Sequence, residues 1–158
     1  MRMEFLLWAT RSLHLFAVVV WLGGILYQAA VTFPVATASG EELKESTRHQ
    51  LRRFLPFIWF CVWTILVTGI GLMLFSPRFI WFSYADNWSV LLGAKQGVFV
   101  LMVFFSVGYV RMFSRLDSVL MEGGDPSSVV VYYERMAQFT RMNVGLALLA
   151  LLLASGMR

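Results

Sequence analysis

Two side chains that can perform acid–base and metal-binding chemistry, His14 and Lys95, stand within strongly apolar stretches of the chain. Ionisable groups inside a membrane are costly, so they usually face the interior of a helix bundle and serve a function. A neutral imidazole is a common metal ligand, and a desolvated lysine can lose its proton and become a donor. A structural histidine bonded to a neighbouring helix, and a lysine reaching the headgroups, are the competing interpretations.

The elements that must position these groups are membrane spans. Of 158 residues, 59% are hydrophobic and only 14% are charged, a balance that a soluble domain of this size does not show. Four windows are long enough to cross roughly 30 Å of hydrocarbon as helices: 15–33, 54–75, 88–110 and about 136–157. We therefore expect an all-α integral membrane protein in which residues 1–158 form one four-helix transmembrane domain.

The basic residues predict how these spans are oriented. Eight cations flank the expected first and third loops: Lys44, Arg48, Arg52, Arg53, Arg111, Arg115, Arg135 and Arg141. Only four lie on the other side: Arg2, Arg11, Arg78 and Arg158. By the positive-inside rule both termini are expected on the outer, periplasmic side of a bacterial-type inner membrane. Anionic lipid explains the basic charge, so no nucleic-acid partner is needed.

Two helices are expected to extend beyond the membrane on the cytoplasmic side. Ser39 with Glu42 forms a capping box, which places the start of the second helix near Gly40. Asp125 followed by Pro126 is a typical helix start, and it places the fourth helix there. Such short connections favour an antiparallel four-helix bundle.

The polar residues of the first span share one helical face. Arg11, His14, Trp21 and Gln28 are spaced by three and seven residues, which stack on one side of a helix. His14 and Lys95 are each expected roughly 10 Å below the outer surface. His49 lies in the charged cytoplasmic run, so it cannot share an iron with His14 within one chain.

Small residues mark one face of the second span. Cys61, Thr64, Thr68 and Gly71 follow helical spacing, with Gly69 beside them. Such faces let helices approach closely, and they can also leave room for a flat macrocycle. In the third span Phe99, Met102 and Ser106 follow Lys95, where bundle packing is the simpler explanation.

The segment from His14 through Trp21, Gly23 and Gly24 to Tyr27 resembles the first helix of HemJ-type protoporphyrinogen oxidases and of the related CopD-like membrane proteins. Trp88 with Lys95 is similar to the HemJ pattern in the third helix, and the four-helix layout also matches. The sequence departs from HemJ where Pro34 and Val35 follow the first apolar run, and where Val144 follows Asn143.

The resemblance implies a haem b protein with oxidoreductase chemistry, either electron transfer, oxidase activity, or oxygen or nitric oxide chemistry at an open haem. It implies His14 as the iron ligand and Lys95 as a sixth ligand or a proton-handling group. Arg11, one turn outward, is placed to pair with a haem propionate, and Trp21 would pack against the porphyrin. The expected partners are membrane lipid, a quinone or other redox partner, and further copies of the chain.

Two other classes of function stay open. The CopD-like resemblance suggests copper handling, because thioethers suit Cu(I) and several methionines are expected near the outer face: Met1, Met3, Met73 and Met157. They form no dense cluster, and methionine is a common apolar filler. The third class is a non-catalytic subunit of a membrane complex.

Overall fold

The computed structural model describes residues 2–38, 41–76, 87–122 and 126–156, nearly all of them helical. The elements in chain order are α1 (Arg2–Tyr27), a π-helical turn η1 (Gln28–Thr32), α2 (Phe33–Ala38), α3 (Glu41–Leu74), α4 (Asn87–Met121) and α5 (Pro126–Gly156). Four helical stretches are long and apolar enough to cross a membrane: Met3–Thr37, Ser46–Leu74, Asn87–Met121 and Ser128–Gly156. The prediction of an all-helical chain with four candidate spans is confirmed.

The helix starts agree with the sequence signals. Helix α5 begins at Pro126, as expected, and α3 begins at Glu41, one residue after the expected position. The expected caps Ser39 and Asp125 lie outside the described residues. Pro126 suits the first position of a helix because its missing N–H would have no partner there.

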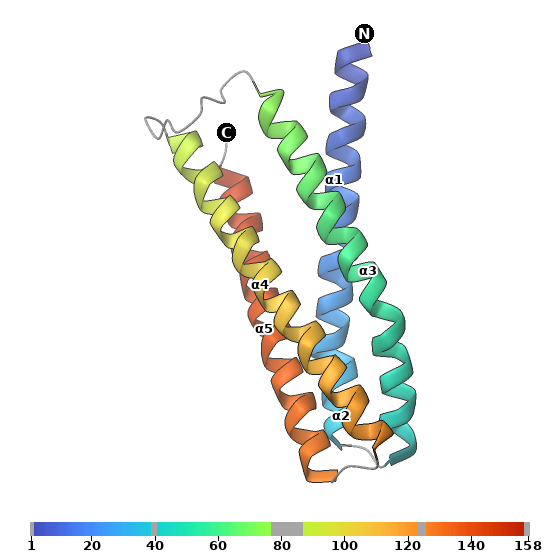
Figure 1. Ribbon diagram of the computed structural model, residues 1–158. Coiled ribbons are helices and arrows are strands. Elements are labelled where there is room, and N and C mark those ends of the chain that lie inside the picture. Colours follow the sequence, from blue (N-terminus) through green and yellow to red (C-terminus); the bar gives the residue numbers. More distant parts are fainter. Residues whose placement is uncertain (1, 39–40, 77–86, 123–125, 157–158) are drawn as a thin grey trace.

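The long helices associate as two pairs. Helix α1 packs chiefly against α3, and α4 packs chiefly against α5. Figure 1 shows the pairs close together at the end that holds α2 and farther apart toward the opposite end. We call these the α2 end and the open end.

Two apolar clusters hold the pairs together. The larger lies at the α2 end and includes the fully buried side chains Phe33, Leu51, Leu116, Tyr133 and Met136. The second lies farther along the bundle and is built from Trp21, Ile25, Cys61, Val98, Met102 and Ala147. Met102 therefore takes part in bundle packing, as its spacing suggested.

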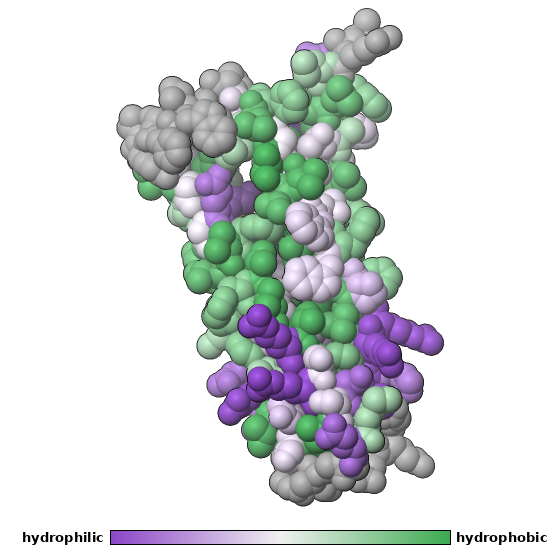
Figure 2. All heavy atoms as spheres, viewed as in Figure 1, coloured by the Kyte–Doolittle hydropathy of each residue, from purple (hydrophilic) through white to green (hydrophobic). Residues whose placement is uncertain are grey.

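The outer surface is apolar along most of the bundle. Large side chains such as Phe16, Phe60, Trp63, Phe104 and Leu152 are more than half exposed. Figure 2 shows green, hydrophobic atoms over the middle of the molecule, with the hydrophilic side chains gathered mainly toward the α2 end. Since water would penalise so much exposed apolar area, the surface is suited to lipid.

The first span departs from a regular α-helix at η1. There the backbone N–H of Phe33 donates to the carbonyl of Gln28, which is the wider spacing of a π turn. Pro34 follows directly, and a proline ring clashes with the carbonyl four residues earlier in a regular helix. The widened turn relieves this clash, so the chain continues as α2 instead of ending before Pro34.

An ion pair joins α3 to α4 near the α2 end. Arg48 Nε donates to Asp117 Oδ1 at 2.6 Å, and both side chains are largely shielded from solvent. A shielded, charge-assisted hydrogen bond is stronger than an exposed one. The pair therefore links two helices that otherwise make few mutual contacts.

We expect Asp117→Ala to lower the free energy of unfolding by about 1–3 kcal/mol, since the shielded Arg48 guanidinium loses its carboxylate. A double-mutant cycle with Arg48→Ala, measured by denaturation in mixed micelles, should give a coupling energy clearly above zero. Arg52→Ala, which removes an exposed cation one turn away, is the control and should change stability little. A zero coupling energy would show that this pair does not hold α3 to α4.

Candidate functional site

His14 is held between α1 and α3. Its Nδ1 lies 2.8 Å from the hydroxyl oxygen of Thr68, and the imidazole is half-buried. The structural partner on a neighbouring helix that the sequence left open is therefore Thr68.

The surrounding hydrogen bonds identify the tautomer of His14. The Thr68 hydroxyl has a single proton and lies within hydrogen-bonding distance of both His14 and the backbone carbonyl of Thr64. We assign that proton to the carbonyl, which can only accept. Thr68 must then accept from His14, so the imidazole proton is on Nδ1. In the neutral ring this leaves a lone pair on Nε2, the atom that would bind a metal or accept a proton.

The small residues of α3 make this contact possible. A Cβ added to Gly69 would lie 3.4 Å from Cε1 of His14, so a larger side chain would press on the ring. A Cβ on Gly71 would lie 4.0 Å from the methyl group of Thr10 on α1. At these two positions the small-residue face packs against α1, which is one of the two interpretations that its spacing allowed.

Lys95 comes from the other helix pair, near the start of α4, and is half-buried. It is close enough to His14 to act on the imidazole electrostatically. The sequence indicated that His14 and Lys95 lie at similar depths in the membrane. It gave no information on whether the helix faces that carry them meet. The structure brings His14 and Lys95 into the same region at the open end.

Arg11 and Trp21, the other two predicted site residues, have contrasting surroundings. Arg11 is exposed one turn before His14 on α1. Trp21 is only 4% exposed and packs in the second apolar cluster against Cys61 and Met102. Its indole N–H is buried, with no hydrogen-bond partner among the described residues.

His49 lies far from His14. It is exposed on α3, and at 1.5 Å per residue its position is roughly 28 Å along the helix from Thr68, which contacts His14. Within the described ranges, no three His, Cys, Asp or Glu side chains gather into a potential metal site.

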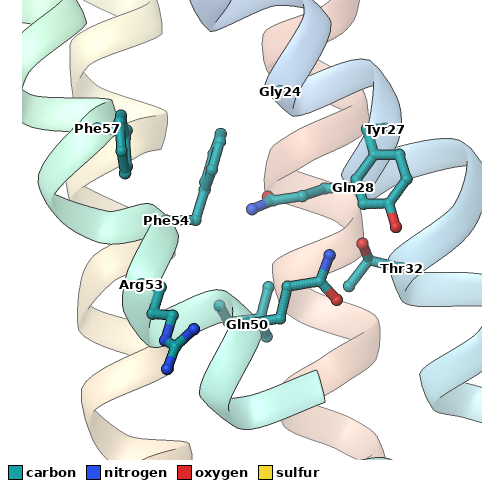
Figure 3. A pocket seen from close by; sticks show the side chains of 9 residues that line it. Gly24, Tyr27, Gln28, Thr32, Gln50, Arg53, Phe54 and Phe57 are labelled. Atoms are coloured by element: carbon teal, nitrogen blue, oxygen red, sulfur yellow. The ribbon is translucent and has the colours of Figure 1, made fainter. Parts of the chain in front are cut away.

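A pocket that the sequence did not indicate lies beside the π turn. Its volume is about 160 Å³, and it lies between η1 and α3, about 15 Å along α1 from His14. Figure 3 shows its side chains: Tyr27, Gln28, Thr32, Gln50, Leu51, Arg53, Phe54 and Phe57, with Gly24 at its edge. The only sequence signal was indirect, because Pro34 requires an adjusted turn just before it.

Comparison of the chain with protein-family models, curated proteins and solved structures finds no match. The resemblance to HemJ-type and CopD-like proteins therefore stays a prediction.

We expect Thr68→Val to destabilise the protein by about 1 kcal/mol and to release His14, because valine keeps the shape but removes the acceptor. Thr68→Ser should preserve the bond. Histidine ¹⁵N correlation spectra of the labelled protein report the tautomer directly. Thr64→Val, one turn away, is the control, since its hydroxyl donates only to the Phe60 carbonyl. A wild-type spectrum with the proton on Nε2 would refute the assignment.

Proposed function

We propose that this chain is an integral membrane protein that binds haem b through His14 and performs oxidoreductase chemistry. The observation that carries the proposal is the hydrogen bond between His14 Nδ1 and the Thr68 hydroxyl. With the imidazole proton assigned to Nδ1, Nε2 keeps the lone pair that can bind a metal. Histidine ligands of metals usually donate their other ring N–H in this way, which fixes the tautomer and the orientation of the ring.

The donor set at the open end fits a haem better than a bare ion. A bare ion needs several protein ligands, and the described residues offer no cluster of three such side chains. A porphyrin brings its own equatorial ligands, so one or two axial side chains suffice. His14 can supply one axial ligand, and Lys95, from the opposite helix pair, can supply a second or move a proton.

The position of the site also supports the proposal. The pocket at the π turn is smaller than the roughly 300–1,000 Å³ of typical cofactor sites, and His14 does not line it. The two helix pairs are farther apart at the open end (Figure 1), and His14 on α1 and Lys95 on α4 come from opposite pairs. In this proposal a planar group would be contacted by one side chain from each helix pair.

The individual residues have distinct roles in this proposal. Thr68 orients the imidazole, and Arg11, exposed one turn outward, is available to a propionate at the water boundary. Trp21 closes the apolar core below the site and keeps water out. Haem b supplies one-electron redox chemistry when it is bound, while its axial ligands and burial tune its potential.

We further infer an antiparallel bundle in a bacterial-type inner membrane, with both termini outside the cytoplasm. The cations Arg48, Arg52, Arg53, Arg111, Arg115 and Arg135 belong to the parts of α3, α4 and α5 near the α2 end. That end would face the cytoplasm, with the helices extending past the bilayer. The haem site would then lie in the outer half of the membrane.

Absorption spectra of the detergent-purified protein, expressed with adequate haem, test the haem proposal. We expect a Soret band that His14→Ala abolishes or strongly reduces and that Lys95→Ala shifts if the lysine binds iron. His49→Ala is the matched control and should leave the spectrum unchanged, because His49 lies at the other end of α3.

Metal and pyridine-haemochrome analysis of the same samples separates the alternatives. Stoichiometric iron with protoporphyrin supports the proposal, and copper without porphyrin would replace it with copper handling. A protein without metal or Soret band, whose His14→Ala variant loses only a binding partner, would indicate a non-catalytic subunit.

Reporter fusions test the orientation. Alkaline phosphatase fused after Arg158 should be active, because it folds only outside the cytoplasm, and a green fluorescent protein fused there should be dark. The opposite pattern, with fluorescence and no phosphatase activity, would invert the topology and put the candidate site in the cytoplasmic half.

A further inference from the structure

The pocket beside the π turn contains a polar group that the fold itself leaves unused. Thr32 is 5% exposed, and its hydroxyl has no partner among the described residues. Hydroxyls elsewhere in these helices, such as those of Thr37, Thr64 and Thr140, donate to carbonyls one turn earlier. At Thr32 the π turn changes the spacing between the hydroxyl and the carbonyl one turn earlier. The Thr32 hydroxyl is therefore available to a ligand.

Gln28 provides a second polar group at the same wall. It is 4% exposed, and its amide faces the Tyr109 hydroxyl, which itself lacks a hydrogen bond of good geometry. Figure 3 shows the Gln28 amide pointing from η1 toward Phe54 on α3. An amide has two N–H donors, so Gln28 can donate one of them into the pocket even when the other bonds to the Tyr109 hydroxyl.

The rest of the lining combines apolar and aromatic side chains with two exposed polar ones, Gln50 and Arg53. Phe54 and Phe57 form the wall on α3, while the exposed side chains of Tyr27 and Arg53 stand at the rim. The pocket belongs to two candidate spans and lies close to the α2 end of the second. A ligand with an apolar tail would therefore reach it from the membrane.

The volume limits what can enter. About 160 Å³ is close to the cavity of roughly 150 Å³ that accommodates benzene in a well-studied case, so one ring fits and a porphyrin does not. The cation of the lining, Arg53, is exposed at the rim, whereas Thr32 and Gln28 are buried. A phosphate placed beside these two buried groups would be a charge removed from water, which is unfavourable. A neutral ring with carbonyl oxygens satisfies both the size and the unpaired donors.

We propose that this pocket binds the head ring of a benzoquinone, with a ring carbonyl accepting hydrogen bonds from the Thr32 hydroxyl and the Gln28 amide. The binding itself does not depend on haem at His14. If the proposed oxidoreductase function holds, the quinone is the lipid-soluble redox partner of that same protein.

Gly24 provides a way to change the shape of the pocket. A Cβ on Gly24 would overlap the ring of Phe54, so Gly24→Ala must push that ring aside and remodel the wall. A Cβ on the adjacent Gly23 meets nothing within 4 Å. Gly23→Ala is therefore a control with the same chemical change at an open position.

Titration calorimetry of the full chain in detergent tests the proposal, with a methyl-benzoquinone carrying one isoprenyl unit as the probe. We expect saturable binding that Thr32→Val weakens roughly three- to tenfold by removing one hydrogen bond. Thr37→Val is the control, because that hydroxyl bonds the backbone outside the pocket. Thr32→Val should retain full thermal stability, since it removes only an unpartnered group.

Shape gives a second, independent criterion. Gly24→Ala should weaken binding at least tenfold while Gly23→Ala leaves it unchanged, and a two-ring naphthoquinone should bind more weakly than the one-ring probe. The proposal would be overturned if neither Thr32→Val nor Gly24→Ala changed the affinity for the quinone, or if no saturable binding were found. Displacement of the probe by phosphatidylglycerol alone would also overturn it, since this would identify a lipid headgroup site. The haem spectra are measured separately, so an absence of quinone binding would not contradict the haem proposal.

Discussion

The hydrogen bond between His14 and Thr68 is the interaction on which the account of this protein depends. It joins α1 to α3 in a part of the chain that is otherwise apolar, and it satisfies a polar group that would be costly to leave unpaired there. The same bond fixes where the imidazole proton resides. Packing and the proposed chemistry are therefore linked, because the contact that joins the two helices also leaves Nε2 as the atom that would bind iron in the haem proposal.

The arrangement of the helices determines where chemistry can occur. The larger apolar cluster and the Arg48–Asp117 ion pair bring the two helix pairs together at the α2 end. The pairs diverge toward the other end (Figure 1). His14 belongs to one pair and Lys95 to the other, and the two are close enough to interact electrostatically. A group bound there would be contacted from both sides. At the α2 end, the π turn instead leaves a smaller pocket with an unpartnered hydroxyl.

Much of this fold could be predicted because lipid imposes a simple rule on sequence. A span needs a long apolar run, and the four runs are plain in the composition. The start of α5 followed from Pro126, whose missing N–H suits a first turn. The π turn could not be predicted in the same way, because Pro34 allows either a helix end or a widened turn, and tertiary packing decides between them.

The candidate site was predictable only in part. An imidazole and an amine at matched depth indicated a shared region, but helix rotation decides whether their faces meet, and no local pattern encodes rotation. Thr68 appeared in the sequence only as one member of a small-residue face, and its role as the acceptor for His14 depends on packing between helices far apart in sequence. The pocket at Gln28 and Thr32 depends on the same long-range packing.

Nitrogen hyperfine spectroscopy of the haem-loaded protein tests the central claim most directly. Protein labelled with ¹⁵N only in histidine should show axial ¹⁵N coupling to low-spin ferric iron, and the coupling should persist in His49→Ala, where His14 is the only remaining histidine. The account predicts that result. Iron bound without any histidine ¹⁵N coupling, or coupling that disappears in His49→Ala, would contradict it.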